Sequence, residues 1–214
     1  MVQKLGILGG SFDPVHKGHL HFALAALDEL SLARVVFIPA ATPPHKLSRH
    51  LVAAAHRVTM LEKALVDHER FTVDRLEIDR GGISFTWQTL TALRERHEET
   101  EFFFIIGSDT LAELATWARL DRIARLVTFA VARRQNDLVP TASPVPTASP
   151  VPTVSPEDLD RALRGATLRT VSLKAARLSI SSTEIRRRIA DHEPWEELVP
   201  PAVAEYIRDE KLYR

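Results

Sequence analysis

The chain has 214 residues, 45% of them hydrophobic, which is enough for one globular domain with a sizeable core and a small subdomain. Its 28 acidic and 28 basic side chains balance, so bulk charge does not favour binding to nucleic acid or to an anionic membrane. Without cysteine it forms no disulfide and uses no thiolate. We recognise no signal peptide and no apolar run of the ~20 residues that span a bilayer, so we expect a cytoplasmic protein.

Short apolar runs alternate with helical spacing along the chain. The runs predict strands at 5–8, 35–38, 71–78, 102–106, 126–132 and 168–173. The spacing predicts helices at about 18–30, 52–67, 85–96 and 111–117, a short helix from Glu157, and helices from Ser182 and Pro201. This alternation is typical of a parallel sheet covered on both faces. We therefore predict an α/β fold, a Rossmann-like doubly wound parallel sheet in a single domain, 1–214, with a C-terminal helical portion.

One stretch breaks the alternation. The letters TASPVP at 141–146 recur at 147–152, and an altered third copy begins at Thr153. Six of the thirteen prolines lie between Pro140 and Pro156, and proline removes the backbone donor that helices and sheets need. We interpret 140–156 as a proline-rich flexible repeat insertion. A docking site for a proline-binding partner is the alternative, but repeat expansion in a solvent loop is favoured, because loops tolerate added length at small entropic cost.

The first chemical motif, GGSFDPVHKGH at 9–19, joins the first strand to the first helix. Ligands of open α/β sheets bind at the carboxyl ends of strands. Glycine lets the backbone approach a phosphate closely, and a helix N-terminus offers unpaired amide donors. His16 and His19 flank Gly18 at this turn, where each could donate a hydrogen bond to a phosphate oxygen. The motif lacks the Gly-Lys-Ser/Thr of a Walker loop, which disfavours P-loop chemistry.

The second motif, SISSTEIR at 179–186, reads as a helix start. Ser182 is a candidate N-cap, although Ser181 or Thr183 could serve instead. Arg186 would lie in the first turn, where its guanidinium could bind a polyphosphate. An ordinary capped helix with a basic surface is an equal reading of this motif alone. Together with the first motif, the phosphate-binding interpretation is favoured.

The two motifs together resemble the HxGH nucleotidyltransferase superfamily. The segments between them resemble its bacterial nicotinate-nucleotide adenylyltransferase branch: FIP at 37–39, PPHK at 43–46, SFT at 84–86 and FIIGSD at 104–109, followed by Leu111, Leu114 and Trp117. They occur in the family's order, and the resemblance covers nearly the whole chain apart from the proline-rich repeat. Phe85 departs from the tyrosine of many members, so no hydroxyl is expected there.

The resemblance implies transfer of the adenylyl group of ATP to nicotinate mononucleotide, giving deamido-NAD and pyrophosphate. It implies a catalytic set of His16, His19, Lys46 and Arg186. It implies that ATP is bound by Gly9, Gly10, Ser11, Phe12, His16, Gly18, His19, Gly107, Asp109, Ser181, Ser182, Thr183 and Arg186. The mononucleotide would be bound by Thr86, Trp117 and Lys46, with Trp117 stacked on its ring.

In such a reaction the attacking group is the substrate's own ionised phosphate, so no general base is required. The enzyme must supply alignment and charge neutralisation. Mg²⁺ would arrive with ATP and keep several waters, so we predict no metal-ligating residues. Selectivity for the acid would come from backbone N–H groups near Thr86 and Trp117 rather than from a cation, since the nearest basic residue in sequence is Arg119.

Three other readings of the sequence stay open. The adenylyl acceptor could be nicotinamide mononucleotide or phosphopantetheine. The chain could be a nucleotide-binding regulator without turnover, although binding alone would tolerate loss of the two histidines and Arg186. It could also be a protein-interaction module built around the repeat. A homo-oligomer is compatible with the sequence.

Overall fold

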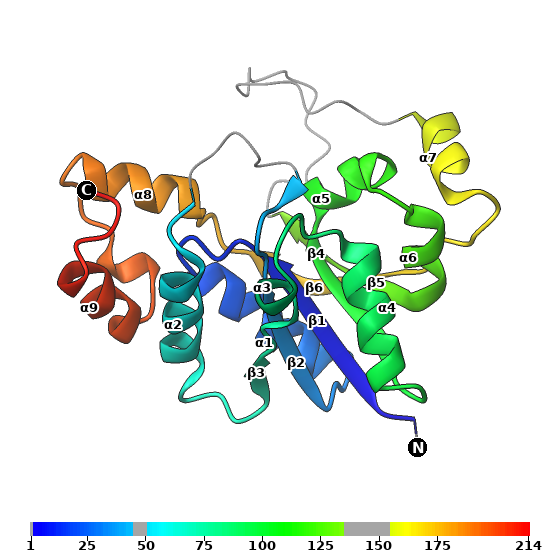
Figure 1. Ribbon diagram of the computed structural model, residues 1–214, viewed down its shortest axis with the longest axis horizontal. Coiled ribbons are helices and arrows are strands. Elements are labelled where there is room, and N and C mark those ends of the chain that lie inside the picture. Colours follow the sequence, from blue (N-terminus) through cyan, green and yellow to red (C-terminus); the bar gives the residue numbers. More distant parts are fainter. Residues whose placement is uncertain (1, 45–50, 135–154) are drawn as a thin grey trace.

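The computed structural model describes residues 2–44, 51–134 and 155–214. At its centre is a six-stranded sheet in which every neighbouring pair of strands is parallel (Figure 1). The strands are β1 Lys4–Gly10, β2 Arg34–Pro39, β3 Phe71–Val73, β4 Glu101–Gly107, β5 Val127–Arg134 and β6 Thr170–Arg177. Their spatial order is β3-β2-β1-β4-β5-β6, which confirms the Rossmann-like doubly wound sheet.

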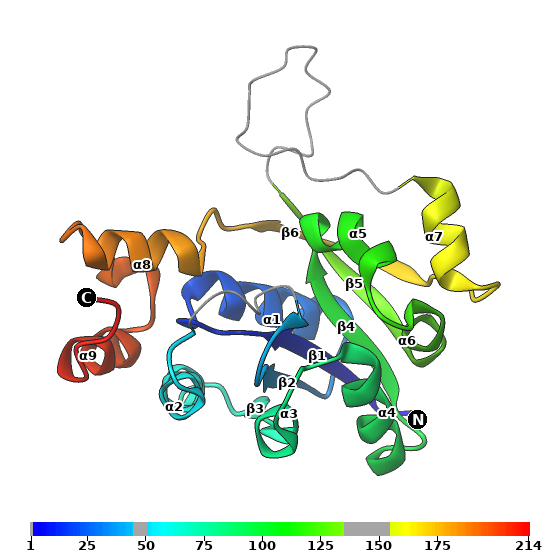
Figure 2. The ribbon, with the colours of Figure 1, turned by 45° about the horizontal axis from the view of Figure 1, so that its top comes forward.

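Helices connect the strands and cover the sheet (Figure 2). The α-helices are α1 Lys17–Glu29, α2 Ala54–Leu65, α3 Leu76–Arg80, α4 Thr86–Arg96, α5 Ser108–Glu113, α6 Leu120–Leu126, α7 Pro156–Leu163, α8 Ser182–Ala190 and α9 Pro201–Asp209. Two short 3₁₀ helices are η2 Leu114–Thr116 and η4 Glu196–Leu198. In the part of the chain that the structure describes, no helix combines the length and apolar character needed to cross a membrane.

The core has two parts, one on each face of the sheet, and β4 shows how the sequence produces them. Its run FFFII is buried on both sides because successive side chains of a strand point to opposite faces. Phe103 and Ile105 pack with α1, α2, α8 and α9. Phe102, Phe104 and Ile106 pack with α4, α6 and the end of α7. A continuous apolar strand is therefore the sequence signature of a sheet covered on both faces.

Several expected boundaries were wrong. The helix expected at 111–117 is α5 followed by η2, the sixth strand runs to Arg177 rather than to residue 173, and helix α6 was not expected. The third strand ends at Val73 and does not reach residue 78, because the side chain of Asp74 accepts the backbone N–H of Leu76 at 2.8 Å and starts helix α3. A helix also begins inside the segment read as a proline-rich loop. Ser155 caps α7 and Pro156 is its first residue, a position where the missing N–H of proline costs nothing. The TASPVP copies themselves lie outside the described residues.

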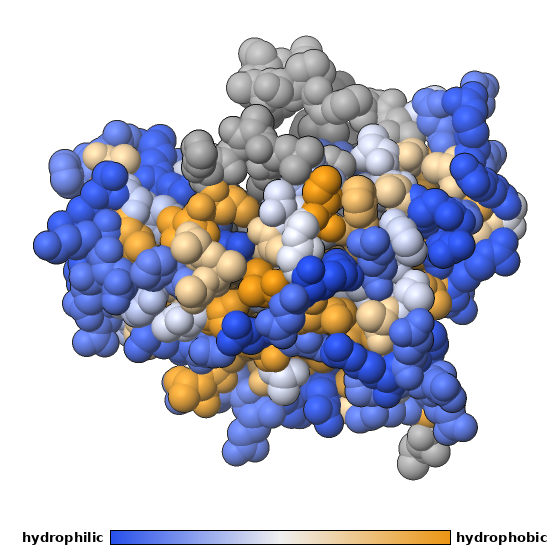
Figure 3. Space-filling view, viewed as in Figure 1, coloured by the Kyte–Doolittle hydropathy of each residue, from blue (hydrophilic) through white to orange (hydrophobic). Residues whose placement is uncertain are grey.

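The strand order reverses between β1 and β4, which are hydrogen-bonded neighbours. Open α/β sheets bind ligands outside the carboxyl ends of the strands at such a reversal. The loops that leave β1 and β4 there carry the glycine-histidine motif and the segment from Gly107. Figure 3 shows apolar residues in the middle of one face, between two mainly hydrophilic ends.

Candidate active site

The loop after β1 is shaped by close packing around Phe12. Phe12 has a φ of 47° and is 1% exposed, with its ring edge-on to His19 at 5.0 Å between centroids. A Cβ on Gly10 would lie 3.2 Å from this ring, so glycine suits the position. We expected Phe12 to line an ATP site; instead its side chain lies in the core beneath the loop, and only its backbone could face a ligand.

The two histidines lie at the start of α1. Their ring centroids are 3.7 Å apart, and His16 is 6% exposed. The backbone N–H of His16 donates to Nδ1 of His19 at 3.2 Å. Because Nδ1 acts as the acceptor, a neutral His19 carries its hydrogen on Nε2. A Cβ on Gly18 would lie 3.0 Å from Nδ1 of His16, so glycine allows this close arrangement.

The start of α8 lies against the same loop. Ser181 is the N-cap, since its Oγ accepts the N–H of Glu184 at 3.2 Å. Ser182, the first candidate for the cap, instead donates its hydroxyl to the carbonyl of Pro14 at 2.9 Å. Arg186 donates to the carbonyl of Asp13 and to the hydroxyl of Thr183. These bonds join two motifs that are about 170 residues apart in sequence.

The two motifs enclose a pocket of about 430 Å³, here called the histidine pocket. It contains most of the predicted phosphate-binding groups. Its lining is Gly10, Ser11, His16, Gly18, His19, Phe22, Asp109, Thr110, Leu178, Ile180, Ser181, Ser182, Thr183 and Arg186. Hydroxyls, imidazoles and a guanidinium therefore converge on one cavity, which is the donor set that a polyphosphate needs.

A second pocket of about 370 Å³, here called the tryptophan pocket, lies over the ends of β1, β2 and β4. It contains the predicted residues Gly9, Thr86, Gly107 and Trp117, with apolar walls that include Ile38 and Phe104. The two pockets share five lining residues: Gly10, Ser11, His19, Phe22 and Thr110. Ligands in the two pockets would therefore meet beside His19.

Trp117 follows η2 and is half-buried. Its ring stands edge-on to Phe104, with centroids 5.9 Å apart and planes at 89°. Its own backbone N–H donates to the carbonyl of Leu114 at 2.9 Å and so already has an acceptor. Thr86 differs, because it is the first residue of α4. The first N–H groups of a helix have no intrahelical acceptor.

Arg57 was missed by the sequence reasoning, although it holds both sides of the site together. It is 2% exposed and donates to four carbonyls: those of Ser11 at 2.8 Å, Ala40 at 2.7 Å, Ala41 at 3.3 Å and Val52 at 3.0 Å. Burial lowers the pKa of its guanidinium, while nearby Asp13 opposes that shift. The sequence did hold a sign of this role, because Arg57 lies four residues before Leu61 and is the one arginine on the apolar face of α2.

Three polar side chains of the tryptophan pocket were also given no role from the sequence. The hydroxyl of Thr89 donates to the buried carboxylate of Glu77 at 2.6 Å. Oγ of Ser84 accepts the N–H of Ala41 at 2.9 Å. Glu77 was hidden because it falls within the stretch read as a strand. Lys46, a predicted catalytic residue, lies outside the described residues.

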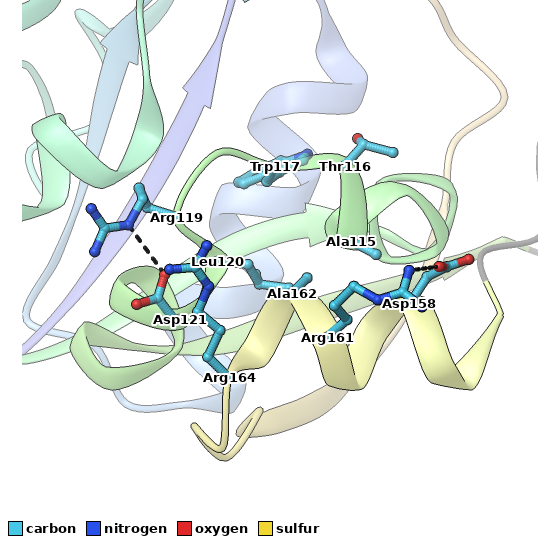
Figure 4. Close-up of a pocket in the computed structure, with 10 residues that line it drawn as sticks. All are labelled: Ala115, Thr116, Trp117, Arg119, Leu120, Asp121, Asp158, Arg161, Ala162 and Arg164. Atoms are coloured by element: carbon cyan, nitrogen blue, oxygen red, sulfur yellow. Dashed lines mark hydrogen bonds and ion pairs between the residues drawn. The ribbon is translucent and has the colours of Figure 1, made fainter.

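A third hollow of about 550 Å³ lies between η2, α6 and α7 and shares Trp117 with the tryptophan pocket (Figure 4). Four of its five charged groups form two ion pairs, Arg119 with Asp121 at 3.4 Å and Arg161 with Asp158 at 2.9 Å, and the fifth is Arg164. Arg161 is 78% exposed, so its ion pair is weak. Because these charges point at one another rather than at a common point, the hollow is a poorer candidate for chemistry than the two pockets.

Comparison with known proteins assigns the chain to a family. The cytidylyltransferase-like family model matches residues 7–188. A relative from Chromobacterium violaceum, named "probable nicotinate-nucleotide adenylyltransferase", is 38% identical over 215 aligned positions, which cover 100% of both chains. One from Lactiplantibacillus plantarum with the same name is 36% identical, covering 99% of this chain and 88% of the relative. This chain belongs to the nicotinate-nucleotide adenylyltransferase family.

Solved structures agree with the fold of this nicotinate-nucleotide adenylyltransferase family member. Nicotinic acid mononucleotide adenylyltransferase from Plasmodium falciparum, complexed with NaAD, superimposes with a TM-score of 0.72. The alignment covers 99% of this chain and 97% of that one at 17% identity. The likeness at such low identity concerns the fold alone.

Proposed function

We propose that this chain transfers the adenylyl group of ATP to nicotinate mononucleotide, releasing pyrophosphate and forming deamido-NAD. One observation carries the proposal: the histidine and tryptophan pockets adjoin at His19. One offers donors for a polyphosphate and the other an aromatic ring for a planar base. Full-length identity with relatives of that name supports the same reaction. The lack of cysteine fits a cytoplasmic location, because proteins of a reducing compartment do not rely on disulfides.

ATP would lie along the histidine pocket. Ser181 and Thr183 at the start of α8 and the guanidinium of Arg186 would bind its outer phosphates. His16 and His19 would face the α-phosphate and the bridging oxygen. Because Nδ1 of His19 is occupied as an acceptor, Nε2 is the atom that would donate. We assign Lys46 the same task of charge neutralisation.

Nicotinate mononucleotide would occupy the tryptophan pocket. The indole of Trp117, held by Phe104, would stack on the pyridine ring. The start of α4 at Thr86 would donate backbone N–H groups to the nicotinate carboxylate. Among the described residues that line this pocket there is no lysine or arginine. Hydrogen bonds rather than a salt bridge would therefore select the acid.

The reaction would proceed by in-line displacement at phosphorus. An oxygen of the mononucleotide phosphate attacks the α-phosphorus of ATP, the new phosphorus–oxygen bond forms, and the bond to the bridging oxygen of pyrophosphate breaks. The nucleophile is already an anion, so no proton has to be removed. The protein would contribute orientation and fixed donors that stabilise the charge on the leaving pyrophosphate.

Magnesium would be bound mainly through ATP. Asp109 is the one carboxylate lining the histidine pocket in the described part of the chain. That donor set fits an ion that keeps several waters and takes most of its ligands from phosphates. When bound, the ion would supply charge neutralisation on the phosphate oxygens. Asp109 is the residue that would help to hold it.

The test is synthesis of the dinucleotide. Purified protein is incubated with ATP, magnesium and nicotinate mononucleotide, and deamido-NAD and pyrophosphate are measured together by chromatography and a coupled phosphate assay. Equal amounts of the two products are expected. Parallel reactions with nicotinamide mononucleotide and with phosphopantetheine serve as controls. Turnover of phosphopantetheine without turnover of nicotinate mononucleotide would contradict the proposal.

A further inference from the structure

The segment after α9 returns to the catalytic loop. Tyr213 has a φ of 66° and is half-buried, packing its ring against the core beside α8 and α9. Its hydroxyl donates to Oδ1 of Asp13 at 2.8 Å, a contact between residues 200 positions apart. Figure 2 shows this end of the chain beside α8 and α9. Tyr213 lines neither the histidine pocket nor the tryptophan pocket.

Asp13 needs the hydrogen bond from Tyr213 because it is a buried charge. Its exposed fraction is 1%, and a buried carboxylate is costly unless it is paired and hydrogen-bonded. Oδ1 accepts the phenol, whereas Oδ2 has no hydrogen-bond partner among the described residues and relies on the Arg186 guanidinium at 3.6 Å. Burial and the neighbouring carboxylate raise the pKa of Tyr213, so the phenol stays protonated and remains a donor.

Contacts with Asp13 in turn hold the Arg186 side chain in position. Its guanidinium donates to the Asp13 carbonyl, lies 3.6 Å from the Asp13 carboxylate, and donates to the hydroxyl of Thr183 at 3.2 Å. Both residues that orient it are in the two phosphate motifs. Arg186 lines the histidine pocket. A shift of the Asp13 carboxylate would therefore move the Arg186 guanidinium, which faces the proposed site of the ATP phosphates.

We propose that Tyr213 is a positioning residue for ATP: by holding the Asp13 carboxylate, it fixes the Arg186 guanidinium in the histidine pocket. The inference rests on the proposed function for the identity of the nucleotide. Without the phenol, neither oxygen of the Asp13 carboxylate has a hydrogen-bond donor among the described residues, and the Arg186 guanidinium at 3.6 Å remains its ion-pair partner. The carboxylate then draws the guanidinium further towards itself or turns towards water and releases it. In either case Arg186 leaves the geometry that suits a phosphate.

The test is Tyr213→Phe, which removes the hydroxyl and keeps the ring. The matched control is Tyr206→Phe on α9, whose hydroxyl makes a hydrogen bond of 2.9 Å with Nδ1 of His56, away from both pockets. For each variant we would measure kcat, the KM of ATP, the KM of nicotinate mononucleotide and the unfolding temperature. Assays would run where circular dichroism shows each variant folded.

Tyr213→Phe is expected to raise the KM of ATP by about 5- to 20-fold, the scale of disturbing one charged hydrogen bond. The KM of the mononucleotide should stay within about twofold. Tyr206→Phe should leave both KM values within about twofold of the parent, even if its unfolding temperature falls as much as that of Tyr213→Phe. An unchanged KM for ATP in Tyr213→Phe would overturn the proposal, and so would an equal rise in both KM values, because that is the effect of a merely structural residue.

A second measurement tests the route through Arg186. If Tyr213 acts through this guanidinium, the double variant Tyr213→Phe/Arg186→Ala should bind ATP almost as tightly as Arg186→Ala alone. The effects of the two substitutions on ATP affinity will then be strongly non-additive. Additive effects would overturn the route. Titration calorimetry with Mg-ATP alone gives the same comparison without turnover. Absence of dinucleotide synthesis by the parent would refute the proposed function, whereas the calorimetric comparison would still decide the role of Tyr213.

Discussion

Replacing Arg57 with methionine should damage both stability and turnover, because the guanidinium ties the loop after β1 to the loop after β2. Methionine keeps much of the apolar stem and removes every donor. The bond to the Ala40 carbonyl is fully buried, and the bonds to Ser11, Ala41 and Val52 are partly buried. The variant therefore separates loss of the donors from loss of packing.

The magnitude follows from these four acceptors. A buried carbonyl left without a donor costs about 1–3 kcal/mol, and each partly buried one costs about 0.5–1 kcal/mol because water replaces the donor. Removing the charge also relieves the cost of burying it, the same cost that lowers the pKa of Arg57. The net expectation is a loss of about 3 kcal/mol in the free energy of unfolding. Turnover should fall at least ~10-fold, since small displacements of aligned groups are costly.

Arg94→Met is the matched control. Arg94 also donates to four carbonyls, those of His97, Glu98, Thr100 and Leu126, but its bonds are exposed or only partly buried. It lies at the far end of α4, outside both pockets. We expect a loss of about 1 kcal/mol and unchanged turnover. Urea unfolding and steady-state kinetics would measure both variants. Equal destabilisation by the two, or normal turnover in Arg57→Met, would refute the reasoning.

Three other predictions concern the site and the repeat. His19→Ala should lower kcat at least ~10²-fold with a much smaller change in KM, the scale of one preorganised donor; kcat within a few-fold of the parent would show that His19 is not catalytic. kcat/KM should be higher for nicotinate than for nicotinamide mononucleotide by about 10² or more, because the amide NH₂ would face donors, and a preference for the amide would contradict this reading. Trp117→Ala should weaken the binding of both mononucleotides alike. Replacing 140–154 with a short Gly/Ser linker, while keeping Ser155 and Pro156 for α7, should leave turnover and the circular dichroism spectrum nearly unchanged; lost activity with an intact fold would show that the segment reaches the site.

The sequence predicted most of the fold because apolar periodicity follows burial directly. The continuous run at 102–106 indicates a strand covered on both faces, and the structure has it in the interior of the sheet. The stretch 71–78 failed because alternation also fits a short strand followed by a helix. What separates the two is one hydrogen bond, from the backbone N–H of Leu76 to the side chain of Asp74, and a pattern of apolar residues does not encode it.

The site could be predicted where a local motif carries the chemistry and was missed where distant segments meet. The two histidines and Arg186 stand in recognisable motifs, and the structure brings them into one pocket. Their assigned roles stay predictions. Tyr213 and Arg57 donate hydrogen bonds to a carboxylate and to carbonyls of distant segments, and the residues next to them in sequence do not indicate these contacts. Phe12 shows a different limit: its side chain lies in the core although it belongs to the glycine-histidine motif, so only its backbone stays a candidate for ATP binding.

The bonds from Ser182 to Pro14 and from Tyr213 to Asp13 have a consequence for how the protein is made. They join residues 168 and 200 positions apart, so the loop after β1 is synthesised long before the segments that bind it. Contacts of such long range form late in folding, because a large loop must close first. A product of interrupted translation that ends before α8 would keep the six strands and lose the seryl and guanidinium side of its histidine pocket. Such fragments would also leave Phe103 and Ile105 without the side chains of α8 and α9 that cover them, so one missing segment removes both a wall of the pocket and part of the core.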